Sequence, residues 1–531
     1  MRGTGPSGDA SRGGPVLLAE PAGFVKLGGI GAGGERVVPM KTFFFALAWT
    51  AAFLIPWAFA GGGEEAGPGK WFRWDASLRV DYFHGGNGKE EWICPDSLWM
   101  QGPWAGPRSR LVDPLDLGGY RVEVRDPSSG ELLFSRGFDS IFGEYKTTGE
   151  AGKGKVRVFR ESCLLPMPKR PLSFRVLALD PGGKARSLLQ VLLDPRDERI
   201  HREKPGMGVI SFQVHRAGPP WKCLDLAFLG EGYTRGQEKK FRRDVERFTG
   251  YLFTQRPFSR FRDRINVWGA FRPSLEEGCD EPDRGVWRHT SLEATHCAFG
   301  LPRYCLTFRN RAVQETAAAV PHDTLAIVVN KKRYGGGGIY NLYCIFAADG
   351  PDPDRVFLHE LGHSFGGLGD EYYSARVAYN DFYPPGVEPR VPNLTALLDP
   401  ARLKWKDLVE PGTPIPTPWG KEAYERLQEK FRGRERALQA QAGRAAPGKE
   451  RERLRRELAA LKKAHKEALR KFLERSPYWN KIGAFEGGGY ASKGLYRPSL
   501  HCLMFAFSPE ERSYCKVCER AIARRIELFL E

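Results

Sequence analysis

Two histidines and a glutamate in the segment HELGHSFGGLGDEY, residues 359–372, have the spacing of a metal-binding helix. His359 and His363 stand four residues apart, so on a helix their imidazoles lie on one face and can bind one metal ion. Glu360 follows the first histidine and can take a proton from a zinc-activated water. Imidazole and carboxylate ligands with one open position are typical of catalytic zinc, so we predict a single catalytic Zn²⁺ ion as cofactor.

The third metal ligand must come from outside this helix. Gly366, Gly367 and Gly369 can end the helix and turn the chain back. The metzincin pattern places a third histidine ten residues after the first, where this chain has Gly369. Asp370 comes next, so we predict Asp370 as the third ligand. Glu371 is the alternative, either as the ligand itself or as a group that orients a histidine.

Residues further along the chain can complete such a site. Met504, in YRPSLHCLMF, follows the metal motif at a distance that suits a Met-turn, the tight turn beneath the metal in metzincins. Hydrolysis also needs a donor that stabilises the oxyanion, and Tyr490 and Tyr496 lie close to Met504 in the sequence. The alternatives are a methionine that fills the core and tyrosines with a structural role.

Residues 40–60, MKTFFFALAWTAAFLIPWAFA, have the pattern of a secretory signal peptide. Lys41 is a short positive region, an apolar run follows, and Ala58–Ala60 has the A-x-A cleavage pattern, which argues against a membrane anchor. Residues 1–39 are rich in glycine, and we expect a non-native or disordered leader with translation starting at Met40. We therefore predict an exported protein, periplasmic or extracellular, with no stable membrane span after signal cleavage.

The ten cysteines include two groups that are close in sequence, and export permits disulfides. The groups are Cys279, Cys297 and Cys305 before the histidine motif and Cys502, Cys515 and Cys518 after it. Pairing within each group fits the sequence, which leaves the connectivity open. Cys515 and Cys518 form a C-x-x-C motif. A redox role needs a thioredoxin-like setting, and a second zinc site needs two more ligands, so we interpret the motif as structural.

The elements that must position these residues fall into two predicted domains. Residues 70–205 carry six partly alternating runs between Pro, Gly and Asp, which predict the strands of a β-sandwich. The runs are SLRVDYF, YRVEVRD, LLFSRGF, KVRVFRESCLL, LSFRVLALD and SLLQVLLD. Residues 209–531 mix the strand-like runs LDLAFLG, INVWGAF and DTLAIVVN with helical spacing, as in the segment GQEKKFRRDVERFTGYLF. The predicted fold class is therefore α+β multidomain, with a metzincin-like α/β zinc peptidase domain after the sandwich.

Residues 420–475 form a distinct insert within the second domain. Apolar residues recur at helical spacing on both sides of Ala446-Pro447-Gly448, which predicts an antiparallel helical hairpin. Residues 421–475 hold 18 Lys and Arg against 9 Glu, so they supply about half of the net charge of +17. Solvated faces of one hairpin explain this charge, and we expect no nucleic acid partner.

The strand-like run DTLAIVVN, residues 323–330, leads into the glycines of residues 335–338. A strand at the edge of a sheet near the metal can pair with an extended peptide substrate, and we assign this role to DTLAIVVN. The alternative is an ordinary buried strand followed by a loop.

Nine segments share their sequence with one family, and the chain resembles it from about residue 70 to residue 530, apart from the hairpin. The segments are SRGFDSIFGEYKTTGEA (135–151), LGEGYT (229–234), DTLAIVVN (323–330), YGGGG (334–338), HELGHSFGGLGDEY (359–372), TPIPTP (413–418), GAFEGGGY (483–490), YRPSLHCLM (496–504) and CKVC (515–518). In combination they resemble the IgA-peptidase family of zinc metalloendopeptidases, a metzincin-like group.

This resemblance implies His359 and His363 as zinc ligands, Glu360 as general base and Asp370 as the third ligand. The chain departs from the family pattern in its helical insert and at Gly336-Gly337, where related chains often carry a serine. These departures concern specificity and leave the chemistry unchanged. Cleavage of immunoglobulin A belongs to particular members and is not implied, since no segment reads as an immunoglobulin-binding module.

The predicted function is that of an exported zinc-dependent endopeptidase that hydrolyses peptide bonds of a protein or peptide substrate, with Glu360 as general base. The alternative is an exported binding or adhesion protein with a degenerate peptidase domain. A zinc amidase acting on a cell-wall polymer is a further alternative. The presence of Glu360 favours an enzyme, and the predicted Met-turn and edge strand favour a peptide substrate. The sequence predicts no particular oligomeric state.

Overall fold

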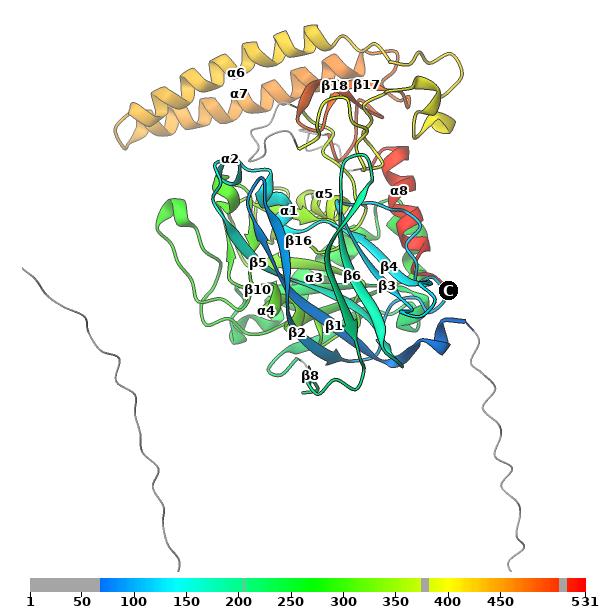
Figure 1. The fold of residues 1–531 in the computed structure, drawn as a ribbon. Helices are drawn as coiled ribbons and strands as arrows, with labels where there is room; N and C mark the ends of the chain where they lie inside the picture. Colours follow the sequence, from blue (N-terminus) through cyan, green and yellow to red (C-terminus); the bar gives the residue numbers. More distant parts are fainter. Residues whose placement is uncertain (1–66, 204–205, 374–381, 506–512) are drawn as a thin grey trace, which may run out of the picture. The chain divides into compact units, whose positions relative to one another are not determined.

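A computed structural model describes residues 67–203, 206–373, 382–505 and 513–531 of the chain (Figure 1). The predicted leader, 1–39, and signal peptide, 40–60, lie outside the described residues. Helices and strands are both abundant, in agreement with a mixed fold that includes an N-terminal β-rich part. Among the helices of the described ranges, none has the length and apolar character needed to cross a membrane.

The N-terminal part contains two four-stranded sheets around one hydrophobic core. The first has the order β5–β1–β2–β8 and the second the order β4–β3–β6–β7. Side chains of both sheets, such as Val80 and Phe174, are buried in that core because alternate residues of a strand face the same side. The strands are β1 (Phe72–Gly86), β2 (Glu91–Gln101), β3 (Tyr120–Arg125), β4 (Leu132–Phe138), β5 (Arg157–Pro168), β6 (Leu172–Leu179), β7 (Ala185–Leu193) and β8 (Ile200–His201).

Strand β2 and two short helices are absent from the sequence prediction. The β2 segment EWICPDSLWMQ contains Pro95 and Asp96, which indicate a turn, but the pairing with β1 shifts register at Asp81 and Tyr82. A bulge at this point accommodates the proline within a paired strand. The helices α1 (Ile141–Lys146) and α2 (Gly149–Gly152) are too short to give a periodic signal.

The second part is built on a six-stranded mixed sheet with the order β15–β16–β14–β10–β11–β9. The four inner strands are parallel, and the two outer strands run antiparallel to their neighbours. Parallel strands that are covered on both faces are mostly apolar, and all eight residues of β10 are buried, including the polar Asp225 and Glu231. The strands are β9 (Ile210–His215), β10 (Leu224–Glu231), β11 (Ile265–Phe271), β14 (Thr324–Val329), β15 (Gly336–Ile339) and β16 (Tyr343–Ala347).

The predicted edge strand is wrong. The run DTLAIVVN forms β14, which lies inside the sheet between β10 and β16. The sequence prediction missed the short strand β16 and therefore placed β14 at the edge of the sheet. The terminal strand is β15, which is formed by the glycine-rich segment itself.

Helices cover the two faces of this sheet (Figure 1). Alternate residues of β10 face opposite sides of the sheet, and each side has its own hydrophobic core. Phe228 is buried in one core and Leu229 in the other. One face packs against α3 (Glu238–Leu252), α5 (Pro353–Ser364) and α8 (Lys516–Glu527). The other packs against α4 (Asn310–Ala317) and against α1 of the N-terminal part. The N-terminal part therefore shares a core with the sheet that carries the histidine motif.

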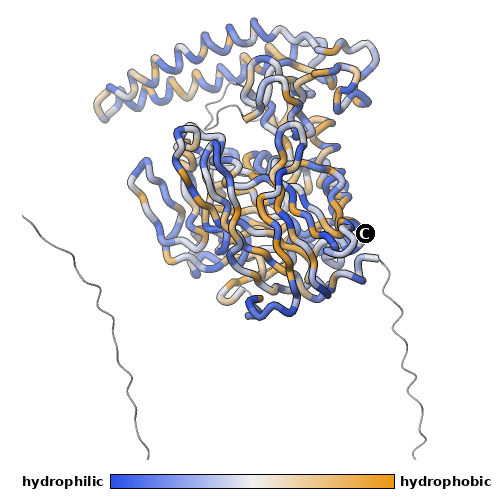
Figure 2. The backbone as a smooth tube through the Cα atoms, in the orientation of Figure 1, coloured by the Kyte–Doolittle hydropathy of each residue, from blue (hydrophilic) through white to orange (hydrophobic). Residues whose placement is uncertain are grey.

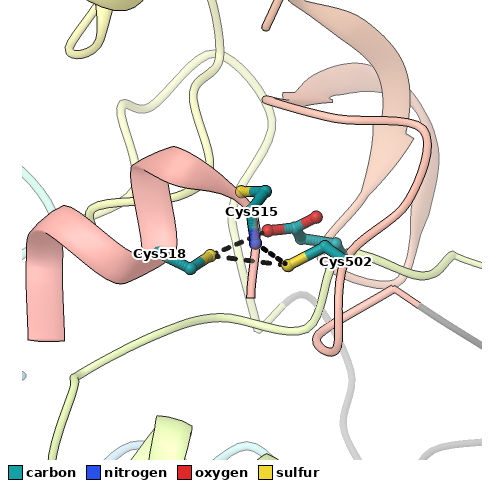
Figure 3. A group of neighbouring side chains, drawn as sticks. Cys502, Cys515 and Cys518 are labelled. Atoms are coloured by element: carbon teal, nitrogen blue, oxygen red, sulfur yellow. Dashed lines mark hydrogen bonds between the residues drawn. The ribbon is translucent and has the colours of Figure 1, made fainter. Parts of the chain in front are cut away.

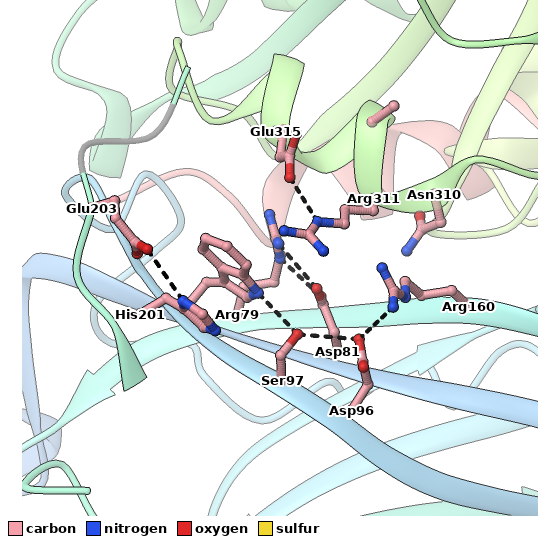
Figure 4. A network of polar contacts seen from close by, with 12 residues as sticks. Arg79, Asp81, Asp96, Ser97, Arg160, His201, Glu203, Asn310, Arg311 and Glu315 are labelled. Carbon is pink, nitrogen blue, oxygen red and sulfur yellow. Dashed lines mark hydrogen bonds and ion pairs between the residues drawn. The ribbon is translucent and has the colours of Figure 1, made fainter. Parts of the chain in front are cut away.

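A polar chain also joins the two parts, and Figure 4 shows its Arg79–Asp81 pair and Asn310. Arg79 and Asp81 of β1 form a buried bidentate ion pair at 2.8 and 2.9 Å. Asp81 accepts a hydrogen bond from Ser162 of β5 at 2.6 Å, and Ser162 accepts one from Asn310 of α4 at 2.7 Å. A charge this deeply buried is costly unless it is paired and hydrogen-bonded, so this chain fixes β1 and β5 against α4.

Helices α6 (Lys421–Arg444) and α7 (Lys449–Glu474) pack along each other (Figure 1). They are strongly hydrophilic, in contrast to the strands of the three large sheets (Figure 2). A narrow set of buried residues, including Leu454 and Leu461, lies between them. Near their ends Tyr424, Leu469 and Leu473 join the main core, which attaches the pair to the α/β part.

Candidate metal centre

Helix α5 positions the histidine motif. Pro353 stands at its first turn, where the missing N–H costs nothing, and Phe357 and Leu361 are buried in the core. The helix ends at a left-handed turn at Gly367, with φ +62°. There the Gly367 N–H donates to the His363 carbonyl at 3.1 Å. Glycine adopts this conformation without steric cost, so the turn follows from the sequence.

The turn brings Asp370 back to the two histidines. His359 Nε2 and His363 Nε2 lie 3.2 Å apart. Asp370 Oδ1 lies 3.1 Å from the first nitrogen and 3.3 Å from the second. The three predicted ligands therefore converge, although ten residues separate the first from the last.

Backbone carbonyls orient both imidazoles. His359 Nδ1 donates to the Leu503 carbonyl at 3.1 Å, and His363 Nδ1 donates to the Leu368 carbonyl at 2.7 Å. A carbonyl only accepts, so each Nδ1 carries the proton and each Nε2 faces Asp370. Second ring nitrogens held in this way are typical of metal-ligating histidines.

The cluster attracts positive charge. Burial opposes ionisation of Asp370, but His363 and His359 hold the pKa of this carboxyl well below its usual range. Burial alone would lower the pKa of His363, yet Asp370 outweighs it and raises that pKa to about 9. Burial raises the pKa of Glu360, although both histidines oppose the shift.

Strand β15 approaches α5 closely because it consists mainly of glycine. A Cβ on Gly336 would lie 2.6 Å from Glu360 Oε1, and a Cβ on Gly338 would lie 2.4 Å from the Glu360 carbonyl oxygen. Both distances are shorter than van der Waals contact allows. The glycine run therefore places an edge strand directly beside Glu360.

Met504 lies beneath α5. It is fully buried, and a Cβ on Gly362 would lie 2.8 Å from its sulfur. Its carbonyl accepts a hydrogen bond from the Glu371 N–H at 3.0 Å. The segment that contains Met504 thus contacts both the helix and the chain that carries Asp370.

The two candidate tyrosines differ. The Tyr490 hydroxyl donates to Asp370 Oδ2 at 2.5 Å, and Tyr490 lines the cleft above the cluster. Tyr496 lies in β18 (Ala491–Arg497), where its backbone pairs with Thr395, and it does not line that cleft. The structure therefore brings Tyr490, and not Tyr496, to the cluster.

Sequence reasoning missed two residues that line the same cleft, Tyr372 and Arg303. The Tyr372 ring stacks over His359 with centroids 6.4 Å apart. Arg303 contributes positive charge that opposes the raised pKa of Glu360. The signal for Tyr372 was its place directly after Asp370-Glu371, whereas no local pattern marks Arg303.

The cleft has a volume of about 660 Å³ and is lined by both parts of the chain. Tyr120, Ser140 and Lys146 come from the N-terminal part, and the histidine cluster lies in the α/β part. A cleft of this size, with converging polar groups in its wall, is typical of an enzyme active site.

Two family models match this chain. Residues 212–526 match the model described as IgA Peptidase M64, and residues 70–190 match the model described as Peptidase M64 N-terminus. The chain belongs to the IgA peptidase M64 family. It is accordingly a peptidase, a hydrolase whose substrate is a protein or peptide. A comparison with curated proteins finds no match.

The family consists of metallopeptidases, and the residues present fit a metal ion. The buried Asp370 Oδ1 accepts no hydrogen bond of regular geometry from a described residue, so it offers a lone pair. With two imidazole nitrogens and one carboxylate oxygen, this M64 cluster has the donor set and the ligand number of a catalytic zinc site.

Glu371 points elsewhere in this M64 peptidase. Its Oε1 accepts hydrogen bonds from Asn393 at 3.0 Å and from the Cys518 thiol at 3.1 Å. It therefore joins the cysteine group of residues 502–518 and does not orient a histidine.

All ten cysteines are free thiols, so the disulfide pairings that fit the sequence are not formed. Cys279 and Cys305 lie together with His296, and Cys297 is outside that group.

Proposed function

We propose that this M64 peptidase is an exported, zinc-dependent endopeptidase. His359, His363 and Asp370 would hold one zinc ion, and Glu360 would act as general base. The observation that carries the proposal is the convergence of the two Nε2 atoms and Asp370 Oδ1 within 3.3 Å at the wall of the cleft. A zinc ion among these three ligand atoms would take the place of the proton that His363 Nε2 shares with Asp370 in the absence of metal.

A zinc ion at this position would polarise a scissile carbonyl and lower the pKa of a water. Glu360 would take a proton from the attacking water and pass it to the leaving amine. Burial supports this role because it raises the pKa of Glu360, which makes its carboxylate a stronger base.

Tyr490 would position Asp370 and supply a phenol at the cleft. Its hydroxyl donates to Asp370 Oδ2, which leaves Oδ1 directed at the histidines. Tyr490 also lines the cleft, and its single O–H would have to turn from Asp370 Oδ2 to a developing oxyanion in order to stabilise the transition state. We assign this role to Tyr490 rather than Tyr496. Met504 would serve as the Met-turn of a metzincin-like site.

Strand β15 would bind the substrate as an extended peptide. It is the terminal strand of the sheet, and Gly336, Gly337 and Gly338 line the cleft beside Glu360. At Gly336 the outer edge is already paired, since its carbonyl accepts from the Cys305 N–H at 3.2 Å. The substrate would therefore align along β15 beyond Gly336, antiparallel or parallel to it.

Replacement of Glu360 by Gln tests the proposed function. Glu360→Gln should keep the bound zinc and the fold but lose casein hydrolysis, because an amide cannot take the proton. Glu457→Gln, an exposed glutamate of α7, is the matched control and should cleave casein at the wild-type rate. Wild-type cleavage by Glu360→Gln, or hydrolysis that resists chelation, would contradict the proposal.

A further inference from the structure

Four buried side chains converge beside the candidate zinc site: Glu371, Cys502, Cys515 and Cys518. The three cysteines are labelled in Figure 3. One ligand atom from each lies within 4.8 Å of all the others. Cys502 Sγ and Cys518 Sγ are 3.7 Å apart, and Cys518 Sγ is 3.1 Å from Glu371 Oε1. They come from three separate segments, so the tertiary fold assembles the group.

The start of α8 shapes the cysteine side of this cluster. Cys515 is the residue before the helix, and Cys518 lies in its first turn. The Cys515 N–H donates to Cys502 Sγ at 3.3 Å. Free N–H groups and the positive end of the helix dipole stabilise negative sulfur at this position.

We propose that these four residues bind a second zinc ion with a structural role. Three soft thiolates together with one carboxylate give the four ligands of a closed zinc site. Cys502 and Glu371 supply the two ligands that the C-x-x-C motif lacks. All four residues are buried, so the site has no open position for a substrate.

A disulfide accounts for the cluster less well. It would use two of the three sulfurs and leave the third thiol beside a buried carboxyl. The second oxygen of this carboxyl, Glu371 Oε2, is buried without a hydrogen-bond partner among the described residues. A buried polar atom without a partner is costly, and coordination of the carboxylate would offset this cost.

The second ion would stabilise the backbone segments that hold the ligands of the catalytic cluster. Glu371 follows Asp370 directly, and its N–H donates to the Met504 carbonyl. Cys502 lies two residues before Met504, and the intervening Leu503 carbonyl accepts from His359 Nδ1. The ion would therefore fix the backbone on both sides of the catalytic ligands to the start of α8.

Zinc content of the purified full-length chain tests this inference. The wild-type chain is expected to hold two zinc ions, and Cys515→Ser/Cys518→Ser and His359→Ala/His363→Ala are each expected to hold one. Cys223→Ser, a buried cysteine outside the cluster, is the matched control and should hold two. Equal zinc content in the wild type and the double cysteine variant would overturn the second site.

The same measurement separates this inference from the proposed function. If the histidine variant keeps the wild-type zinc content while the cysteine variant loses one ion, the proposed function fails and the second site stands. If instead the histidine variant loses one ion and the cysteine variant keeps the wild-type zinc content, the proposed function stands and the second site is overturned.

Cobalt provides a measurement that does not require the cysteine variant to fold. With Co²⁺ in place of zinc, His359→Ala/His363→Ala should show sulfur-to-cobalt charge-transfer absorption, because it retains the thiolates. Alkylation of denatured, chelator-treated wild type without reductant should label Cys502, Cys515 and Cys518. Absence of the absorption, or a disulfide among the three, would overturn the proposal.

Discussion

Two clusters of candidate metal ligands are adjacent in this peptidase, and consecutive residues contribute to them. Asp370 joins two histidines whose side chains are 16% and 17% exposed, at the wall of the cleft. Glu371 joins three cysteines, and this cluster is wholly buried. The first set can admit a substrate and the second cannot. Burial and donor type, rather than sequence proximity, therefore separate a candidate catalytic site from a structural one.

The two clusters also differ in what holds them. Carbonyl oxygens orient the imidazoles through their Nδ1 protons, whereas a backbone N–H donates to Cys502 Sγ. A carbonyl that accepts the Nδ1 proton leaves Nε2 of a neutral imidazole free to bind a metal, whereas an N–H that donates to sulfur favours the charged thiolate. Experiments that treat the clusters differently can therefore test whether their roles are separate.

The largest expected effect is on turnover at the open cluster. Glu360→Gln should lower kcat by about 10²–10⁴-fold, because the general base is lost. The thermal midpoint Tm should stay close to that of the wild type. Steady-state hydrolysis of a fluorogenic peptide, with Tm measured in parallel, checks this. A Tm that falls as far as activity would mean that Glu360 is mainly structural.

Replacing Asp370 or Glu371 separately by its amide should weaken a different zinc ion in each case. Asp370→Asn should weaken the zinc that supports activity, and Glu371→Gln should weaken the buried zinc and lower Tm. Glu371→Cys supplies a fourth thiolate and should restore both zinc and Tm. Zinc competition with a chromophoric chelator measures each affinity. If both single variants lose the same ion, the two clusters are one site.

Chelation should remove the two ions at different rates. A chelator should abolish activity first, since the histidine cluster faces the cleft, and should extract the second zinc only slowly. Timed samples analysed for activity and zinc content would record one ion lost with activity and one lost later. If both ions are lost at the same rate, the difference in burial between the two clusters does not control how fast a chelator removes zinc.

A smaller effect is expected for Tyr490→Phe, which removes the hydrogen bond to Asp370 Oδ2. Groups that orient a metal ligand commonly contribute about 10–100-fold to affinity or activity. Tyr496→Phe is the matched control, because that side chain does not line the cleft. Equal kcat/KM values for the two variants would remove Tyr490 from the site.

The smallest effect is expected at Asn393, which lies between the clusters. Its side chain hydrogen-bonds the Gly369 N–H and carbonyl at 2.8 Å each and donates to Glu371. Asn393→Ala should cost about 1–3 kcal/mol of unfolding free energy, since buried polar groups lose their partners. Urea unfolding measures this. Retention of zinc in both sites would distinguish lost stability from a lost ligand.

Local patterns predicted much of the fold. Spacing placed the helix around His359, and the glycine at 367 marked its end, because both are properties of a few adjacent residues. Strand β2 was missed because Pro95 lies at a bulge that only the partner strand reveals. The position of β14 inside the sheet was missed because strand order depends on pairing between distant segments.

Neighbouring residues alone specify the available chemistry: two histidines and a glutamate at helical spacing, followed by a turn that returns a carboxylate. They leave open whether Asp370 or Glu371 would face the histidines. In extended backbone, neighbouring side chains point to opposite sides, so one residue of register decides the partner of each. Only the tertiary structure sets this register, through the bond from Glu371 N–H to Met504 and the arrival of α8 with its cysteines.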